Sequence, residues 1–451
     1  MEHVVNWVTD TGYSHIPKEA TDNAKKCILD GLGVAIAGSL EPASQRVIQY
    51  VSEIGARPEA SVIGGGFKSS CPHAALANGT MTHALDFDDM SGSLVHFTAV
   101  LMPTVLALGE CLKISGEKAL ESYILGWEVG AKIGDQISND AMQRGWHNTG
   151  TIGSLSAAIA AAKVLGLNNE QTLTALGIAS SQAGGLIANF GTDTKPLHAG
   201  SAAQTGVVAG LLASRGFTAN KTILEGPIGF SKIFSGIECD IAPVSVQLGN
   251  PYNIISPGPT IKVYPSCGTS HPTIASVLEI TTKHTIDAEE VAEVECRVSQ
   301  SAADILRYSS PETVNEAKFS LHYCVARALI SGNVTLQDFT KEKIHSLEVQ
   351  ALMKRVRVVV SNVETTGTRA HAVTITLRDG RQYSHSAPTL KGKPENPLSW
   401  DEVHQKFRDC AEAFLDAHDI DLVTELVLSL ESLEDINKLT NLITMKNSVR
   451  H

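Results

Sequence analysis

The sequence has little of what marks nucleic-acid-binding, disulfide-stabilised or zinc-binding proteins. A formal net charge of -12 leaves no surplus of basic residues, which argues against partners such as nucleic acid or an anionic membrane surface. None of the eight cysteines form a CxxC pair, so zinc-ribbon and thioredoxin-like classes lack support. Thiols scattered in this way are typical of a reducing compartment.

Export signals and long apolar runs are also missing. Residues 1–5 contain neither a basic segment nor an apolar core, so we expect no secretory signal. The most apolar window, residues 151–167, contains Lys163 and is shorter than the roughly 20 residues of a membrane helix. These absences predict a cytoplasmic protein with no membrane partner.

The pattern of apolar residues predicts a mainly α protein with two domains, because 451 residues exceed one small core. From about residue 17 to 235 the periodicity is helical, with Gly or polar breaks followed by good N-caps. β-branched alternation occurs at 291–298 and 356–360, and a hairpin pattern at 372–384. We predict a large all-helical domain from residues 1–258 and 395–451, with a smaller α+β lid domain inserted at 259–394.

The densest group of ionisable residues is His83, Asp86, Asp88, Asp89 and His96, directly before an apolar helix-like run. Charges packed so tightly beside a hydrophobic segment are costly unless they pair, bind a metal or act on a ligand. A metal site is one alternative, although the spacing of an EF-hand and the HExxH motif are absent. The other is a solvated loop whose aspartates cap helices.

Three basic residues precede predicted helices. His147 comes just before an Ala-rich helix, Lys195 before the helix of residues 202–213, and Lys262 before a helix near Ser270. A cation at a helix N-terminus is disfavoured by about 0.3–1 kcal/mol, so something must outweigh that cost. An anionic ligand held by helix N–H groups and a lysine would do so. These positions predict a site for a small polyanion.

Taken together, these motifs resemble those of the MmgE/PrpD family over nearly the whole chain. The resemblance rests on HALDFDD at 83–89, His96, the Trp146–His147 turn, TKPLHAG at 194–200, Lys262 with YPSC at 264–267, and EAKFSLHY at 316–323. It implies a large helical domain, an α+β lid, a homodimer, and no metal or organic cofactor. The reactions it implies are decarboxylation of cis-aconitate, dehydration of 2-methylcitrate and epimerisation of iminodisuccinate.

The resemblance also implies a set of site residues. The Asp, two His, two Lys and Tyr of the decarboxylase branch fall on Asp86, His96, His147, Lys195, Lys262 and Tyr323. Two positions depart from the family pattern and are expected to contact substrate: Met90 replaces a Thr, and Cys267 replaces a His. Cys267 could equally be a packed thiol. A further departure is Phe97 where a Pro usually follows the histidine.

All of these reactions build negative charge next to a carboxylate, and stabilising that charge is usually the largest catalytic contribution. We expect Lys195 and Lys262 to bind the substrate carboxylates. His147 is the expected proton donor, with His96 as its partner. Asp86 is expected to orient a histidine, and Tyr323 to donate from its hydroxyl.

The sequence therefore predicts a cofactor-independent lyase acting on a small tricarboxylate, either cis-aconitate decarboxylase-like or 2-methylcitrate dehydratase-like. Two alternatives stay open: an epimerase of a dicarboxylate such as iminodisuccinate, and a family member that binds carboxylates without turnover.

Overall fold

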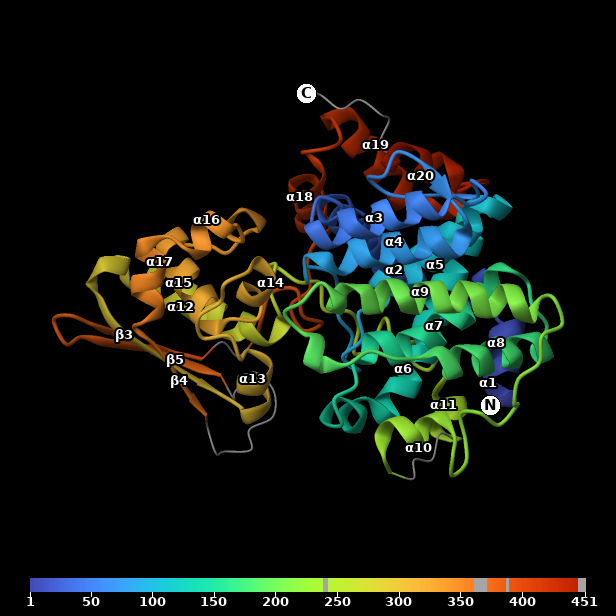
Figure 1. Cartoon of the computed structure of the whole chain (residues 1–451), viewed down its shortest axis with the longest axis horizontal. Coiled ribbons are helices and arrows are strands. Elements are labelled where there is room, and N and C mark those ends of the chain that lie inside the picture. Colours follow the sequence, from blue (N-terminus) through green and yellow to red (C-terminus); the bar gives the residue numbers. More distant parts are fainter. Residues whose placement is uncertain (238–241, 361–370, 387–388, 445–451) are drawn as a thin grey trace. The chain divides into compact units, whose positions relative to one another are not determined.

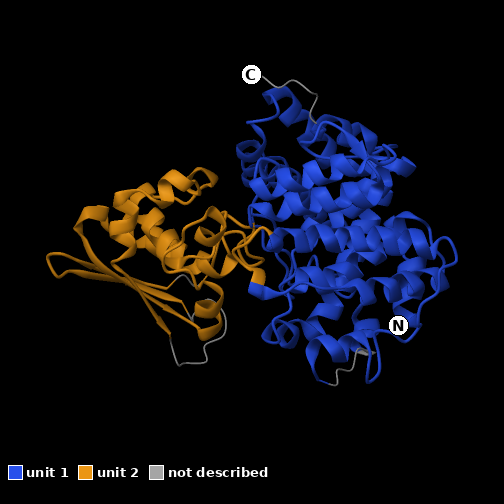
Figure 2. Ribbon diagram, viewed as in Figure 1, with its two compact units in different colours: residues 1–188, 194–261, 398–451 blue, residues 189–193, 262–397 orange. Residues whose placement is uncertain are grey.

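The computed structural model describes residues 1–237, 242–360, 371–386 and 389–444, which form two compact units (Figure 2). Unit 1 comprises Met1–Ala188, Thr194–Ile261 and Leu398–His451, and unit 2 comprises Asn189–Asp193 and Lys262–Pro397. Both ends of the chain therefore belong to unit 1. The division into domains at 258/259 and 394/395, and the role of a lid, stay predictions. Residues 361–370 and 387–388 of the predicted lid lie outside the described residues.

In the described residues of unit 1, the regular structure is helical apart from a short ribbon in which β1 (Ala60–Ser61) pairs antiparallel with β2 (Lys68–Ser69) (Figure 1). Its helices are α1 (Glu2–Asp10), α2 (Lys18–Gly38), α3 (Pro42–Ile54), α4 (Cys71–Ala84), α5 (Phe97–Leu112), α6 (Gly116–Gln143), α7 (Asn148–Val164), α8 (Asn169–Gln182), α9 (Thr194–Ala213), α10 (Phe230–Ser235), α11 (Ala242–Gln247), α18 (Trp400–Ala411), α19 (Ala417–Leu428) and α20 (Asn437–Ile443).

Small residues let the central helices of unit 1 approach closely. A Cβ added to Gly79 of α4 would lie 2.8 Å from the Cα of Gly200 in α9, closer than real Cβ contacts come. On α9, Gly206 faces Ala157 of α7 just as tightly. Because side chains keep helix axes apart in proportion to their size, these glycines bring α4, α7 and α9 together, and these are the helices that carry the site described below.

Unit 2 contains a four-stranded sheet in the order β4-β3-β5-β6, in which only the β3–β4 pair is parallel. Figure 1 shows α12 and α15 on one face of this sheet. The strands are β3 (Val291–Val298), β4 (Val356–Val360), β5 (Ala372–Leu377) and β6 (Gln382–His385); the helices are α12 (His271–His284), α13 (Gln300–Ile305), α14 (Val314–Ala317), α15 (Leu321–Ser331), α16 (Lys341–Ile344) and α17 (Leu347–Met353).

The elements confirm the prediction of a mainly α protein, and the predicted hairpin is the β5–β6 pair. Among the described residues, none of the helices is long and apolar enough to span a bilayer.

Candidate active site

The loop after α4 directs the acidic cluster into unit 1, and the far end of the chain holds it there. Asp86 has a φ of +51°, a left-handed conformation that Asp tolerates better than most residues. Lys406 of α18 donates to the carbonyl of Phe87 at 2.8 Å and pairs with Asp30 of α2 at 2.6 Å. Its ammonium also lies 3.7 Å from the centre of the Phe87 ring. A buried lysine near the C-terminus thus fixes the loop that carries Asp86 and Asp88.

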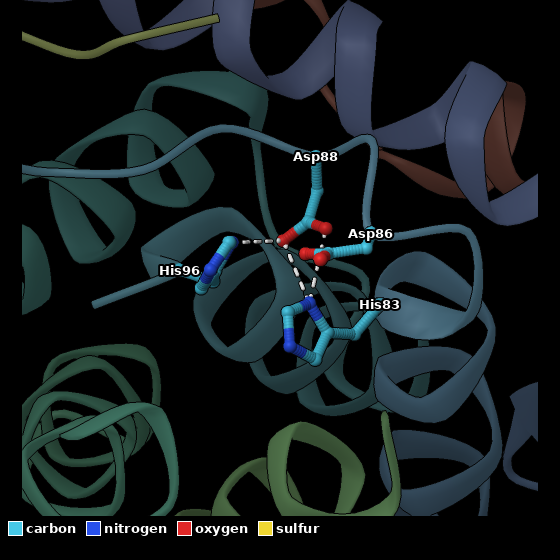
Figure 3. Close-up of side chains that lie close together, drawn as sticks. All are labelled: His83, Asp86, Asp88 and His96. Atoms are coloured by element: carbon cyan, nitrogen blue, oxygen red, sulfur yellow. Dashed lines mark hydrogen bonds and ion pairs between the residues drawn. The ribbon is translucent and has the colours of Figure 1, made fainter. Parts of the chain in front are cut away.

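Asp88 joins two histidines through one buried carboxylate (Figure 3). Its Oδ1 lies 3.0 Å from Nδ1 of His83, and its Oδ2 lies 3.0 Å from Nδ1 of His96, the N-cap residue of α5. An ionised carboxylate only accepts hydrogen bonds, so both rings carry a proton on Nδ1. Burial opposes ionisation of Asp88, but the two histidine rings more than offset it and hold its pKa well below the usual range.

Lys195, in the first turn of α9, binds the opposite side of His83. Its Nζ lies 2.9 Å from Nε2 of His83 and 3.0 Å from Oδ1 of Asp86. Burial, assisted by the charge of Lys195, outweighs the attraction of Asp88 and lowers the pKa of His83 to about 3. His83 is therefore neutral: it donates from Nδ1 to Asp88 and accepts at Nε2 from the ammonium.

The same four side chains are the ones that could surround a metal ion. One ligand atom from each of His83, Asp86, Asp88 and His96 lies within 4.8 Å of the others (Figure 3). However, the Lys195 ammonium already binds His83 and Asp86, and Asp88 already accepts from both rings. A divalent cation would have to displace a buried positive charge, so the donor set fits an internal hydrogen-bond network better than a metal centre.

A second pair of histidines continues this cluster. His147 is the N-cap residue of α7, and its Nδ1 lies 3.0 Å from Nδ1 of His198 in α9. The His147 ring also stacks on His83, with centroids 5.9 Å apart. Burial and the charge of Lys195 hold the pKa of His147 well below its usual range and lower that of His198 to about 4. The structure thus brings His147, Lys195, Asp86 and His96 together through His83.

The third carboxylate of the motif points elsewhere. Asp89 accepts a hydrogen bond at 3.3 Å from the backbone N–H of Thr98, in the first turn of α5, and a short one from its hydroxyl. Burial raises the pKa of Asp89 to about 7. The alternative of a solvated loop is wrong, because Asp86, Asp88 and Asp89 are all buried, although Asp89 does bind the first turn of α5. Asp86 and Asp88 belong to the cluster.

The predicted helix starts are correct for all three basic residues. His147 precedes α7 and Lys195 lies in the first turn of α9. The helix expected near Ser270 is α12, which begins at His271 with Ser270 as its N-cap residue. Lys262 itself lies before the 3-10 turn at Gly268–Ser270 and not at the helix N-terminus, so the dipole argument does not apply to it.

The other predicted site residues are placed as follows. Met90 is half-buried and its backbone pairs with that of Thr260, with N···O distances of 2.9 and 2.8 Å. Lys262, Cys267 and Tyr323 are buried residues of unit 2. Cys267 donates its N–H to the Lys318 carbonyl, and the Tyr323 hydroxyl donates to the carbonyl of Asp338 in a short hydrogen bond. Their contact with substrate stays a prediction.

Comparison with known proteins decides the family. Residues 2–240 match the MmgE/PrpD N-terminal domain, and residues 264–431 match the MmgE/PrpD C-terminal domain. The chain belongs to the MmgE/PrpD family. The resemblance predicted from the motifs is thus confirmed.

Relatives of this chain from three organisms are named cis-aconitate decarboxylase. The protein of Mus musculus is 30% identical, over 95% of this chain and 90% of its own length. The protein of Homo sapiens is 27% identical, over 95% of this chain and 91% of its own length. The protein of Aspergillus terreus is 28% identical, over 98% of this chain and 95% of its own length.

Three residues of the cluster in this MmgE/PrpD protein lie outside the predicted site: His83, Asp88 and His198. His83 and Asp88 belong to the dense ionisable group and flank Asp86 in the motif, but they are not among the predicted catalytic or substrate-binding residues. The signal for His198 was its spacing, because it follows Lys195 by three residues on α9 and so lies on the same helix face.

Proposed function

We propose that this protein is a lyase that decarboxylates cis-aconitate or a closely similar small tricarboxylate, by proton transfer next to a carboxylate. The observation that carries the proposal is the buried cluster in which His147, His96 and Lys195 meet around His83. The prediction of a lyase of this family is confirmed by relatives named decarboxylase that match 95% or more of the chain. The exact substrate is the proposed part.

The proposed reaction needs one charge stabilised and one proton supplied. When the bond to the departing carboxylate breaks, CO₂ leaves and its bonding electron pair stays on the substrate. Lys195, whose charge Asp86 partly balances at 3.0 Å, offsets the new negative charge. His147 donates a proton to the carbon that holds the electron pair. His96, kept with its proton on Nδ1 by Asp88, presents its Nε2 to the substrate.

The test is to incubate the purified, chelator-treated protein with cis-aconitate, 2-methylcitrate or iminodisuccinate in deuterated buffer. The proposal predicts CO₂ release from cis-aconitate and one solvent deuterium on carbon in the product. Water loss from 2-methylcitrate alone would make the protein a dehydratase instead. Deuterium exchange into iminodisuccinate alone would make it an epimerase. Citrate binding with no turnover of any acid would show a binding protein and end the lyase proposal.

Lysine variants test how the acid is held. We expect Lys195→Ala and Lys262→Ala each to weaken calorimetric binding of citrate by about tenfold, as for loss of a charge-assisted hydrogen bond. The matched control is Lys221→Ala, which removes an exposed lysine paired with Glu170. Unchanged citrate binding in Lys195→Ala would contradict its role. A homodimer, a cytoplasmic location and independence from metal and organic cofactors complete the proposal, and sedimentation of the purified protein tests the dimer.

A further inference from the structure

His147 and His198 form a pair that one glycine holds in place. Gly185 has a φ of +125°, and its carbonyl accepts the backbone N–H of His147 at 3.0 Å. A Cβ on Gly185 would lie 3.1 Å from the Cγ and Nδ1 of His198, so the missing side chain leaves room for that ring. Gly185 therefore positions both rings: its carbonyl binds the backbone of His147, and its lack of a side chain leaves space for the ring of His198.

The contact between the rings requires one Nδ1 atom to be the hydrogen-bond donor and the other to be the acceptor. A hydrogen bond of 3.0 Å between two nitrogens needs a proton on one and a lone pair on the other. The groups that face the pair are Lys195 on α9, His83 on α4 and His96 before α5. Lys195 is a cation, so it disfavours a second proton on either ring. Each ring therefore carries one proton near neutral pH, and the tautomer of one ring dictates that of the other.

Two arrangements of these protons are possible. In the first, His198 donates from Nδ1 to Nδ1 of His147, which leaves the His147 proton on Nε2. In the second, His147 donates from Nδ1, and its Nε2 holds a lone pair. Only the first arrangement lets a neutral His147 act as a proton donor from Nε2. A neutral imidazole that simply lost this proton would become an anion, so it needs a simultaneous supply at Nδ1.

We propose that His198 is a proton relay to His147: it supplies a proton to Nδ1 of His147 as Nε2 of His147 gives its proton to the substrate, so that a proton passes from solvent through both rings. This inference rests on the proposed decarboxylation, which consumes one solvent proton for each CO₂ released. In the step, Nε2 of His147 gives its proton to the substrate carbon, Nδ1 of His198 gives its proton to Nδ1 of His147, and Nε2 of His198 takes a proton from solvent, which leaves the pair in the second arrangement. The first arrangement returns after the product leaves, when Nε2 of His147 takes a proton from solvent, Nδ1 of His147 returns its proton to Nδ1 of His198, and Nε2 of His198 releases one to solvent. Both rings stay neutral, and His198 is the more exposed of the two, at 9% against 4%.

Two substitutions of His198 separate relay from support. In His198→Asn the amide can still donate to Nδ1 of His147 but cannot pass a proton on, whereas His198→Ala removes both functions. We expect kcat to fall by about 10²-fold in each variant, with little change in citrate binding. Added imidazole should restore activity in His198→Ala, where the ring leaves space, and not in His198→Asn. The matched control is His404→Asn on α18, which should leave kcat unchanged.

The relay can be judged separately from the reaction. Nitrogen-15 NMR of labelled histidines reports which ring nitrogen of His147 carries the proton, and His198→Asn should lock that proton on Nε2. If no acid is turned over but the tautomer of His147 follows substitution of His198, the proposed function fails and the coupling of the rings stands. If His198→Asn decarboxylates cis-aconitate at the wild-type rate with an unchanged pH profile, the relay is refuted and the decarboxylase stands.

Discussion

We expect acid to destabilise this protein because its buried histidines are neutral in the folded state. The pKa of His83 falls from 6.5 to about 3 on folding, mainly because burial disfavours the charged ring. Between those values the unfolded chain binds a proton that the folded protein does not. The contribution of His83 to stability is therefore complete above about pH 6.5 and declines as the pH falls toward 3.

The size of the effect follows from the same pKa values. One pKa unit corresponds to about 1.4 kcal/mol, so His83 alone contributes at most about 5 kcal/mol over this interval. His147 acts in the same direction. For His198, with a pKa of about 4, solvent screening at its open edge reduces the contribution to about 1 kcal/mol per pH unit. Asp89 acts in the opposite direction, because its pKa rises from 3.8 to about 7 on folding, and it offsets much of the His83 contribution over the same interval. The net loss of stability on acidification is therefore mainly that of His147 and His198.

Urea unfolding followed by tryptophan fluorescence, at about pH 7, 6 and 5, measures this decline. His198→Asn removes one of the rings, so its free energy of unfolding should fall less steeply by about 1 kcal/mol per pH unit. His3→Asn is the matched control, because His3 is exposed to solvent. If the free energy of unfolding of His198→Asn has the same pH slope as that of the wild type between pH 7 and 5, the neutral state of buried His198 is refuted.

Three further substitutions test how the cluster is held. Asp88→Asn leaves one acceptor oxygen for two ring N–H groups. We expect kcat in the CO₂-release assay to fall by about 10²–10⁴-fold, while circular dichroism shows a folded protein. A wild-type kcat would contradict the role of Asp88 in orienting the two histidines. Lys406→Met removes the ammonium that pairs with the buried carboxylate of Asp30 and should cost about 3–5 kcal/mol in urea unfolding. An unchanged midpoint would exclude Lys406 as an anchor. Gly185→Ala places a Cβ against the His198 ring, at a residue with a φ of +125°. The free energy of unfolding should fall by about 1–3 kcal/mol, and kcat should fall as well, although no ionisable group is lost. A wild-type kcat would show that the histidine pair tolerates displacement.

Local sequence patterns predicted the elements well, because helix caps and hairpins are decided by neighbouring residues. Asn168 and Ser115 cap α8 and α6 through their side chains, as expected for polar residues after helix breaks. The helix predicted near Ser270 likewise begins at His271, with a proline in its first turn.

The partners inside the site could not be predicted in the same way. Asp86 and Lys195 are 109 residues apart, and the anchor of the acidic loop, Lys406, is 319 residues from Phe87. Helical periodicity tells which face of α4 or α9 is buried, but not which helix will lie against it. The close packing of Gly79 on Gly200 determines that neighbour, and with it the contact of Lys195 with His83.

The charges of the cluster change how the site should be understood. Three basic residues at helix starts predicted a positive site, yet in unit 1 Lys195 pairs with Asp86. The same cluster contains a second carboxylate, Asp88, and the neutral rings of His83, His147 and His198. Such a cluster has no positive excess with which to attract a trianion, so attraction must depend on further cations, with Lys262 as the predicted one. What the cluster does supply is a set of ring protons, each held on a defined nitrogen by a carboxylate, an ammonium or another ring. Substitution of the lysines should therefore weaken binding of the acid, whereas substitution of Asp88 or His198 should slow proton delivery and leave binding nearly unchanged.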